Sequence, residues 1–391
     1  MATISKYEIQ SGATLYRVRY RTPDRRQTDK RGFKTKRDAE AFAASIEVDK
    51  LHGSYVSPAA GKVQLGEVAE QWLATKHKLK PSTRARYQVV IDNFIQVRRH
   101  VPLNSISAEL LDIWVHQMID TGASAATISK TFSVLRQILA LAVERKKITS
   151  NPVDKLELPE VAEMEQRVLS ADQLQLLADA AGVNAPLVWL LGTCGLRFGE
   201  AAELRWRDVD LPRLRLQISR SVVLVDNKFI VGKPKNGKGR TVAIPEFVAA
   251  LLEPSRGAAN ELVFPDSQGG HMRGTNVRRR WWSRAVEAAE LFPRFETGDT
   301  NSTVVVYDFK IHELRHTAAS LAIQAGANIK SLQNMLGHTS AGLTLDRYGH
   351  LYPSDVEAVG IAVNNLITAQ IAQECGHGVG TGRTAGVRDT E

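Results

Sequence analysis

Residues 312–316 read His312-Glu313-Leu314-Arg315-His316, and they are followed by Leu336-Gly337-His338 and by Arg347-Tyr348-Gly349-His350. Imidazole and guanidinium groups therefore gather near a tyrosine within a short part of the chain. The pattern predicts that a helix begins near His312, which would place His312 and Arg315 on one face. Two more basic stretches lie upstream, namely Gly195-Leu196-Arg197-Phe198-Gly199-Glu200 and a lysine-bearing turn that contains Lys235.

The stretch from His312 to His316 also fits the H-E-x-x-H pattern of zinc peptidases, in which two histidines one helical turn apart bind the metal. Against this interpretation, Arg315 would place a full positive charge beside a dication on the same helix face. The longer signature with a third histidine does not follow in the sequence. A zinc peptidase built on His312 and His316 stays as the alternative, while the preferred interpretation needs no metal and no cofactor.

A second near-match is the glycine-rich segment from Gly232 to Gly239, which nearly spells a phosphate-binding P-loop. Gly239 stands where that motif requires serine or threonine. The residues that follow, Thr241-Val242-Ala243-Ile244, favour a strand over the helix that a P-loop needs. We therefore reject a nucleotide hydrolase.

Cleavage of a phosphodiester without a metal needs positive donors around the nonbridging oxygens, a nucleophile, and an acid for the leaving hydroxyl. Arginine suits the first role because its planar fork can hold two phosphate oxygens. The residue types for such a site occur in the order Arg197, Lys235, His312, Arg315, His338 and Tyr348. Lys233 and Lys238 compete with Lys235, and Tyr352 competes with Tyr348, but the Lys235-Asn236-Gly237 turn and the Tyr348-Gly349-His350 context favour the first choices.

This ordered set resembles the catalytic constellation of the phage-integrase family of tyrosine site-specific recombinases, and the resemblance spans Thr193 to Tyr352. It implies that Arg197 and Arg315 clamp the scissile phosphate, while His312 and His338 add hydrogen bonds and assist proton transfer. Lys235 would protonate the leaving 5′-oxygen, and Glu200 would orient nearby catalytic groups. Tyr348 would attack and form a 3′-phosphotyrosine link.

Several neighbouring residues have structural interpretations. Arg197 and Glu200 could be a simple helix ion pair. His316 is expected to pack or to form a structural hydrogen bond, and His350 to support the site or lie at the surface. Trp281 and Trp282, with the Arg278-Arg279-Arg280 run, predict a core-facing helix with a basic outer face, for which contact with the DNA backbone is the alternative.

Charge is concentrated near the N-terminus. The net charge is +9, and the segment from Arg17 to Arg37 holds ten Lys or Arg residues against Asp24 and Asp29, an excess of eight. In Tyr16-Arg17-Val18-Arg19-Tyr20-Arg21, alternation sends Arg17, Arg19 and Arg21 to one face of a strand, which is suited to DNA phosphates. The two cysteines, Cys194 and Cys375, are too few for a disulfide framework. No secretory signal is apparent, and the longest uncharged stretch, Ala180 to Leu196, is too short for a membrane span. We expect a cytoplasmic protein with no membrane partner.

The sequence predicts an α+β chain in four segments. Residues 1–56 form a small sheet followed by a helix that Thr35 and Asp38 open, and residues 62–158 form a bundle of four helices. The resemblance implies that the first is a three-stranded arm-type DNA-binding domain and the second a core-binding domain. Residues 166–370 form a mostly helical catalytic domain with a small antiparallel sheet, including strands over Leu214–Val225 and Arg240–Ile244. Its helices are expected to begin at Ser170-x-x-Gln173, Pro245, Asn276, His312, Ile329 and Ser354. Residues 371–391 read as a mobile tail.

The resemblance implies an integrase for a phage or mobile element that acts on double-stranded DNA at core and arm-type sites. It also implies a homotetramer on DNA, with possible DNA-bending and directionality factors as partners. A topoisomerase of related chemistry is disfavoured by the separate basic N-terminal segment. A non-catalytic DNA-binding regulator would explain the charge but not the ordered set of catalytic residue types.

Overall fold

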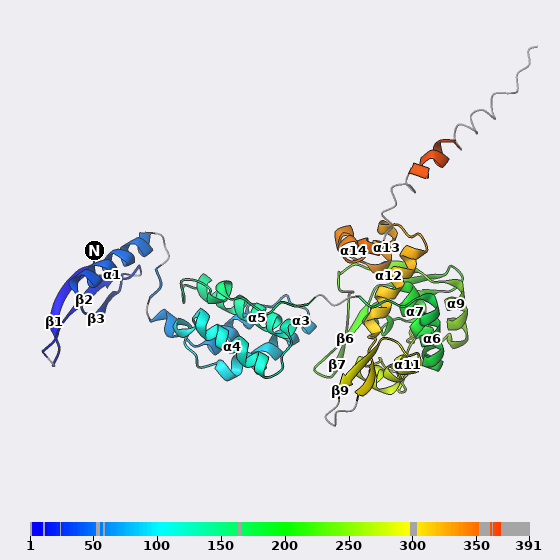
Figure 1. The fold of residues 1–391 in the computed structure, drawn as a ribbon, viewed down its shortest axis with the longest axis horizontal. Helices are drawn as coiled ribbons and strands as arrows, with labels where there is room; N and C mark the ends of the chain where they lie inside the picture. The colour runs from blue at the N-terminus through cyan, green and yellow to red at the C-terminus, as the bar shows by residue number, and fades with distance from the viewer. Residues whose placement is uncertain are drawn as a thin grey trace, which may run out of the picture. The chain divides into compact units, whose positions relative to one another are not determined.

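The computed structural model describes residues 2–10, 12–23, 25–51, 55–57, 59–162, 166–297, 303–351, 360–361 and 363–368 (Figure 1). The chain divides into two compact units, of which the first comprises residues 1–165 and 224–228 and the second comprises residues 166–223 and 229–391. Two separate apolar cores lie within the first unit. The α+β class predicted from the sequence is confirmed.

The N-terminal part is an antiparallel sheet with one helix against it, in the strand order β1-β2-β3. Val18 and Tyr20 on the central strand are buried against Ala39 and Ile46 of the helix, which lies along one face of the sheet (Figure 1). Arg17, Arg19 and Arg21 alternate with these buried residues, so they belong to the opposite face, as predicted. The elements are β1 (Thr3–Glu8), β2 (Thr14–Arg21), β3 (Gln27–Phe33) and α1 (Lys36–Leu51).

The second core belongs to a bundle of four helices, again as predicted. Aromatic rings occupy its centre, where Phe94 packs at 5.5 Å from Phe132 and 5.8 Å from Trp114 between ring centroids. Ser107 caps the third helix by accepting the backbone N–H of Leu110 at 3.3 Å. The helices are α2 (Leu65–Ala74), α3 (Pro81–Val90) with its π-helical continuation η2 (Ile91–Ile95), α4 (Ala108–Asp120) and α5 (Ala125–Glu144).

Two helical stretches, Ala125–Glu144 and Ala171–Cys194, are long and apolar enough to cross a membrane by length and composition alone. Both contribute to interior packing. In the first, Ile128 and Phe132 are fully buried in the four-helix core. The second is interrupted by a 3₁₀ turn after Gly182, and Leu174 and Val188 on its two sides are buried in the core of the second unit. We interpret both stretches as core helices.

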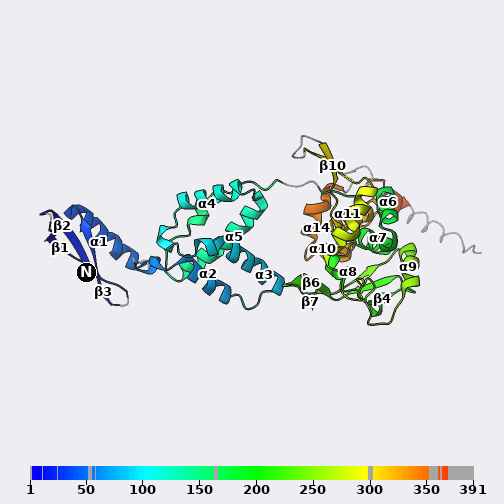
Figure 2. The same ribbon diagram turned by 90° about the horizontal axis from the view of Figure 1, so that it is seen from below.

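The second unit packs helices around the largely apolar helix α7, which contacts both α6 and α12 (Figure 1). Figure 2 shows α6 and α7 side by side. Ser170 and Gln173 form the predicted capping box at the start of α6. The helices are α6 (Ala171–Ala181), α7 (Ala185–Cys194), α8 (Phe198–Ala201), α9 (Glu246–Leu252), α10 (Gly274–Val277), α11 (Ser283–Ala288), α12 (Leu314–Gln324), α13 (Ile329–Leu336) and α14 (Ala341–Tyr348).

The described strands after residue 166 form three small sheets, ordered β4-β5-β8, β6-β7 and β10-β9. The tip of the β6–β7 hairpin, residues 224–228, is grouped with the first unit. The sequence did not predict β7 as a separate strand, nor the β9–β10 hairpin, nor helix α14. The helix expected at Ser354, the alternative nucleophile Tyr352 and the tail 371–391 lie outside the described residues. The strands are β4 (Val209–Asp210), β5 (Arg215–Ile218), β6 (Ser221–Val225), β7 (Lys228–Gly232), β8 (Arg240–Ala243), β9 (Pro293–Thr297) and β10 (Thr303–Tyr307).

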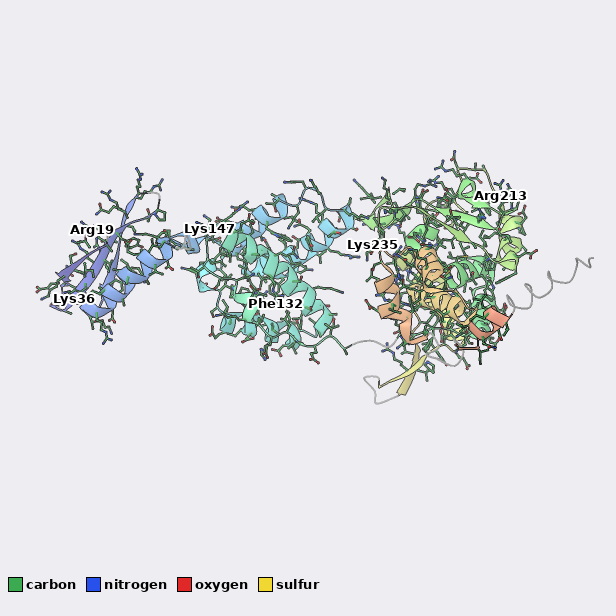
Figure 3. The ribbon with its side chains drawn as sticks, turned by 90° about the horizontal axis from the view of Figure 1, so that it is seen from above. Arg19, Lys36, Phe132, Lys147, Arg213 and Lys235 are labelled. Atoms are coloured by element: carbon green, nitrogen blue, oxygen red, sulfur yellow. The ribbon has the colours of Figure 1, made fainter. Side chains whose placement is uncertain are left out.

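Phe132, labelled in Figure 3, lies in the middle of the four-helix core with none of its surface exposed. Phe132→Ala should lower the free energy of unfolding of this bundle by about 3–5 kcal/mol, because it removes buried apolar surface and leaves a cavity. Urea unfolding followed through the fluorescence of Trp72 and Trp114 would measure the change. Val97→Ala, at a side chain that is 74% exposed, is the matched control and should change stability by less than about 0.5 kcal/mol.

Candidate active site

Tyr348 is the last residue of α14, a helix that Ser340 caps by accepting the N–H of Leu343 at 3.3 Å. The tyrosine is only 1% exposed. Its hydroxyl lies 2.8 Å from Nδ1 of His316. Burial raises the pKa of Tyr348, and the positive charges of Arg315 and Arg347 oppose that shift. The phenol is therefore protonated at neutral pH and already hydrogen-bonded to an imidazole.

Arg315 is buried beside this tyrosine, with 4% of its surface exposed. Its guanidinium donates to the carbonyls of Gly195 and Leu336, each at 2.5 Å. These carbonyls lie at the C-terminal ends of α7 and α13, where helices leave acceptors without intrahelical partners. Burial, followed by the charge of Arg197, lowers the pKa of Arg315 to about 9, so the side chain stays cationic at neutral pH.

Arg197 precedes α8 and is linked to Glu200 in two ways. Its backbone N–H donates to one carboxylate oxygen at 3.0 Å, and its guanidinium donates to the other at 2.9 Å. The glycine two residues earlier explains the local geometry. Gly195 ends α7 in the left-handed region at φ +64°, and a Cβ there would lie 2.9 Å from a methyl carbon of Leu336. A larger residue would separate the two helix ends that Arg315 joins.

Glu200 is the buried anion at the centre of this basic cluster, with 1% of its surface exposed. Arg240 on β8 donates to both of its oxygens, at 3.1 and 2.7 Å, and also to the carbonyl of Met335 at 2.8 Å. Burial alone would raise the pKa of Glu200. The hydrogen bonds and charges of Arg240 and Arg197 outweigh that effect and hold the pKa below its ordinary value.

His338 follows Gly337, which ends α13 at φ +65°. Nδ1 of His338 lies 2.9 Å from the hydroxyl oxygen of Thr344 on α14. Burial, with the charges of Arg315 and Arg197, lowers the pKa of His338 to about 4. The ring is therefore neutral at physiological pH, so that one of its nitrogens donates a hydrogen bond and the other accepts one.

Lys235 is exposed in the turn between β7 and β8 (Figure 3). The adjacent Asn236 donates its side-chain N–H to the carbonyl of Gly337, which ties this turn to the segment that carries His338. His312 lies in the 3₁₀ turn η10 (Ile311–Glu313). The pKa of His312 is lowered, chiefly by loss of hydration in the surrounding protein. The positive charges of Arg315 and Arg197 add to this effect, and that of Lys235 adds more weakly. The charge of Lys235 therefore acts on the same cluster.

The structure thus brings together Arg197, Glu200, Lys235, His312, Arg315, His338 and Tyr348, which come from five separate segments of the second unit. A hollow of about 540 Å³ opens beside Arg197 and His338, and Lys238 and Arg240 also line it. The walls carry positive charge and hydrogen-bond donors, which are suited to a phosphate group. Arg17, Arg19 and Arg21 belong to strand β2 in the first unit.

The contacts of His316 and Arg315 do not support a zinc site. His316 forms its hydrogen bond with Tyr348, and Arg315 lies buried next to it. Within the described residues, no group of three or more His, Cys, Asp or Glu side chains is placed to hold a metal ion. The segment that resembled a P-loop leads into strand β8, as its sequence predicted.

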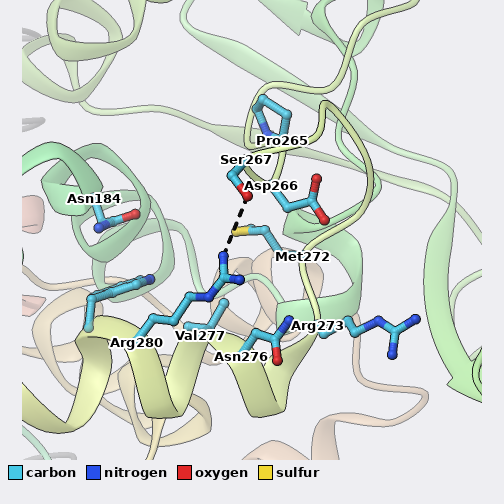
Figure 4. A pocket seen from close by; sticks show the side chains of 10 residues that line it. Asn184, Pro265, Asp266, Ser267, Met272, Arg273, Asn276, Val277 and Arg280 are labelled. Carbon is cyan, nitrogen blue, oxygen red and sulfur yellow. Dashed lines mark hydrogen bonds between the residues drawn. The ribbon is translucent and has the colours of Figure 1, made fainter.

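A smaller hollow, of about 140 Å³, lies beside α10 and the π-helical segment η9 (Arg278–Trp282) (Figure 4). Arg280 donates to the hydroxyl of Ser267 across it at 3.5 Å, and none of its ten lining residues is a histidine, cysteine or tyrosine. Trp282 points inward and donates to the carbonyl of Phe309 at 2.7 Å, while Arg278, Arg279 and Arg280 are exposed. The core-facing Trp282 and the basic outer face agree with the prediction for this segment, and contact of its arginines with the DNA backbone stays a prediction.

Three family profiles match separate parts of the chain. The description "Phage integrase family" matches residues 167–355, which contain the whole cluster, "Arm DNA-binding domain" matches residues 12–50, and "Phage integrase SAM-like domain" matches residues 64–158. The chain belongs to the phage integrase family. It is a tyrosine site-specific recombinase, an enzyme that cleaves and rejoins DNA. The zinc-peptidase and non-catalytic alternatives are left without support.

Relatives agree along most of the chain. The recombinase is 28% identical over 341 residues to a proposed integrase of prophage phiRv2 from Mycobacterium tuberculosis, with 81% of this chain and 84% of that one covered. It is 26% identical over 333 residues to the integrase of Mycobacterium phage D29, with the same shares covered.

Solved structures show the same fold. A lambda integrase tetramer bound to a Holliday junction matches with a TM-score of 0.55 and 19% identity, covering 86% of this chain and 96% of that one. The Tn1549 transposon integrase in complex with a circular intermediate DNA matches with a TM-score of 0.64 and 18% identity, covering 78% and 99%.

Sequence reasoning did not single out Arg240 or Thr344, and it gave His316 only a structural role. Arg240 is one arginine in a short strand, and nothing in its immediate sequence indicates that it reaches Glu200. The contact between His316 and Tyr348 depends on how α12 and α14 pack. The one signal in the sequence was Glu200 itself. A carboxylate that is buried requires positively charged partners, so a second cation such as Arg240 could have been sought for it.

Arg240→Met should lower the free energy of unfolding of the second unit by about 3–5 kcal/mol at neutral pH, because it leaves the buried Glu200 carboxylate with one fewer cationic partner. The lowered pKa of Glu200 stabilises the native protein above the ordinary carboxyl pKa, and this contribution is lost as the pH falls through the lowered value. In the variant, burial would raise the pKa of Glu200 instead. The deficit relative to the native protein should therefore grow as the pH rises from about 4 to about 7.

Denaturant unfolding at several pH values measures this deficit. The double variant Glu200→Gln, Arg240→Met also removes the buried carboxylate charge of Glu200. It should therefore recover part of the lost stability. A deficit that does not change with pH would contradict the assignment of Arg240 as the partner of an ionised Glu200.

Proposed function

We propose that Tyr348 is the nucleophile with which this recombinase cleaves DNA, and that Arg197, Arg315, His312 and His338 hold the scissile phosphate. The observation that carries the proposal is the placement of the Tyr348 hydroxyl in a cluster of guanidinium and imidazole groups that converge from separate segments. Two arginines oriented by carbonyl and carboxylate acceptors are fixed before the substrate arrives. Such preorganised donors stabilise the charge that develops on a phosphate in the transition state.

In this mechanism the phenol oxygen of Tyr348 bonds to phosphorus as the bond to the 5′-oxygen breaks. Lys235 donates a proton to the leaving 5′-oxygen, and its position on a turn tied to Gly337 supports this role. Glu200 orients Arg197 and Arg240 and does not touch the phosphate. The 3′-phosphotyrosine link preserves the bond energy, so attack by a 5′-hydroxyl from the second DNA end rejoins the strand without ATP.

The remaining assignments concern DNA and partners. We propose that residues 1–56 bind arm-type sites through Arg17, Arg19 and Arg21, that residues 62–158 bind the core site, and that residues 166–370 catalyse strand exchange. The lambda integrase tetramer on a Holliday junction supports a homotetramer on DNA as the active assembly. The biological role would be integration and excision of a phage or similar mobile element in the cytoplasm of its host, with DNA-bending and directionality factors as further partners.

The experiment that tests the proposal as a whole is to trap protein-linked DNA in cells that carry the element and to sequence the linked ends. Ends bonded to protein through a 3′-phosphate at one recurring sequence are the expected result. This experiment also identifies the core site for the assays below. Random ends, or no covalent adduct, would contradict site-specific cleavage.

Tyr348→Phe should bind DNA with nearly unchanged affinity but form no covalent adduct on a nicked substrate that traps the cleaved state. The phenyl ring preserves packing, while the attacking oxygen is gone. Denaturing gel electrophoresis of labelled DNA measures the adduct. An adduct that persists in Tyr348→Phe and disappears in Tyr352→Phe would show that Tyr352 is the nucleophile.

Replacing Arg17, Arg19 and Arg21 together with Ala should abolish binding to arm-type sites and leave core-site cleavage intact. These residues lie on the sheet face opposite the apolar core, so their removal should leave the fold of the sheet unchanged. The log–log salt dependence of arm binding should flatten by up to about one unit for each DNA phosphate that the variant no longer neutralises. Footprinting the variant and the native protein on attachment-site DNA measures the outcome, and identical footprints would exclude this face as the reader of arm sites.

A further inference from the structure

His316 lies where the attacking oxygen must lose its proton. Its Nδ1 is 2.8 Å from the hydroxyl oxygen of Tyr348, and the two ring centroids are 5.8 Å apart. His312, which the family resemblance assigned to the phosphate, lies at the other side of His316 with ring centroids 5.9 Å apart. The two histidines of the H-E-x-x-H stretch therefore have different partners, and the one that touches the nucleophile is His316.

We propose that His316 is a catalytic residue that aligns the Tyr348 hydroxyl and accepts its proton as the tyrosine attacks the scissile phosphate. The inference rests on the proposed role of Tyr348 as the nucleophile. In the tautomer with its own proton on Nε2, His316 accepts the hydroxyl proton at Nδ1. The same contact then serves rejoining, when the proton returns to the phenol oxygen.

The step balances as follows. The bond between the Tyr348 oxygen and phosphorus forms, the bond between phosphorus and the 5′-oxygen breaks, the phenol proton moves to Nδ1 of His316, and the 5′-oxygen takes a proton from Lys235. In the reverse direction the 5′-hydroxyl attacks phosphorus and returns its proton to Lys235. Tyr348 leaves and recovers its proton from His316. One base on each side of the phosphorus is thus sufficient for both directions.

The electrostatics set the timing of this transfer. Burial, with His312, Arg347 and Arg315 around the ring, lowers the pKa of His316 to about 4, whereas the pKa of Tyr348 is raised above 10.0. Transfer of the proton before attack is therefore unfavourable. The proton must move as the oxygen bonds to phosphorus, which makes the phenol oxygen strongly acidic. A bound phosphodiester also adds negative charge that opposes the effect of these cations on His316.

The test compares His316→Ala and His316→Asn in single-turnover cleavage of a nicked duplex that carries the mapped core site. Asn keeps an acceptor oxygen near the position of Nδ1 but cannot take a proton, so it separates alignment from proton transfer. Both variants should cleave about 10² more slowly than the native enzyme at pH 7, the scale for loss of a general base. DNA affinity and thermal unfolding of His316→Asn should match the native protein. His350→Ala, at an exposed histidine just after Tyr348, is the matched control and should cleave at the native rate.

Two readouts exclude a merely structural role. Without the base, only ionised Tyr348 reacts, so cleavage by both variants should rise about tenfold per pH unit from about pH 7 to about pH 9, while the native rate stays nearly constant. A substrate with sulfur in place of the 5′-bridging oxygen has a leaving group that needs no acid. It should restore cleavage by Lys235→Ala and should not restore cleavage by His316→Ala.

The contrary outcomes are distinct. A native rate in His316→Asn would reduce His316 to an aligning residue, and rescue by the bridging sulfur would place it on the leaving-group side. Faster cleavage by His316→Ala would mean that the contact restrains Tyr348 instead of activating it. Each of these results overturns the inference while Tyr348→Phe remains inactive. Adduct formation by Tyr348→Phe would instead overturn the proposed nucleophile.

Discussion

The hydrogen bonds of the Arg315 guanidinium are the interaction on which the candidate active site depends. The guanidinium is buried and donates to carbonyls at the ends of α7 and α13, two helices whose next residues include Arg197 and His338. Arg315 belongs to α12, which also carries His316, and the 3₁₀ turn just before α12 carries His312. One side chain thus fixes the mutual positions of three segments. A guanidinium has five N–H donors, so Arg315 can donate to these two carbonyls and still have N–H groups to offer to a phosphate.

A second constraint is the excess of positive charge. The combined field of four arginines adds to the effect of burial in lowering the pKa of His338 to about 4, and these are Arg315, Arg197, Arg347 and Arg240. One buried carboxylate, that of Glu200, accepts hydrogen bonds from Arg240 and Arg197. Holding these cations together is unfavourable until an anion arrives, and a phosphodiester is such an anion. The fold maintains the arrangement because Arg240 and Arg197 share the carboxylate and because backbone carbonyls fix Arg315. The site is therefore organised before DNA binds, so that little reorganisation is left for the reaction itself.

The sequence predicted the three helical and strand-rich segments, the alternation that buries Val18 and Tyr20, and the order of the candidate catalytic residues. Local patterns were strong there, because caps such as Ser107 and Ser170 and periodic apolar positions report on local structure. Helix α14 was missed because Gly342 and Thr344 weaken its helical pattern, although Tyr348 packs it into the core. The roles of Arg240 and His316 depend on contacts between segments far apart in the chain. No local pattern reports such contacts, so only the fold reveals them.

The glycines of the two most specific motifs have a physical reason that unites them. Gly195 and Gly337 both end a helix at positive φ, near +64° and +65°, and both are crowded by a neighbour that a Cβ would meet at 2.9 Å, Leu336 in one case and Arg240 in the other. Each glycine stops its helix and turns the chain so that the next residues, Arg197 and His338, enter the cluster. Each also leaves a carbonyl at or next to the helix end, and Arg315 donates to both. The Gly-Leu-Arg and Leu-Gly-His motifs therefore specify a backbone geometry as much as a reactive side chain. A substitution at either glycine would displace Arg197 or His338 without changing the chemistry of its side chain.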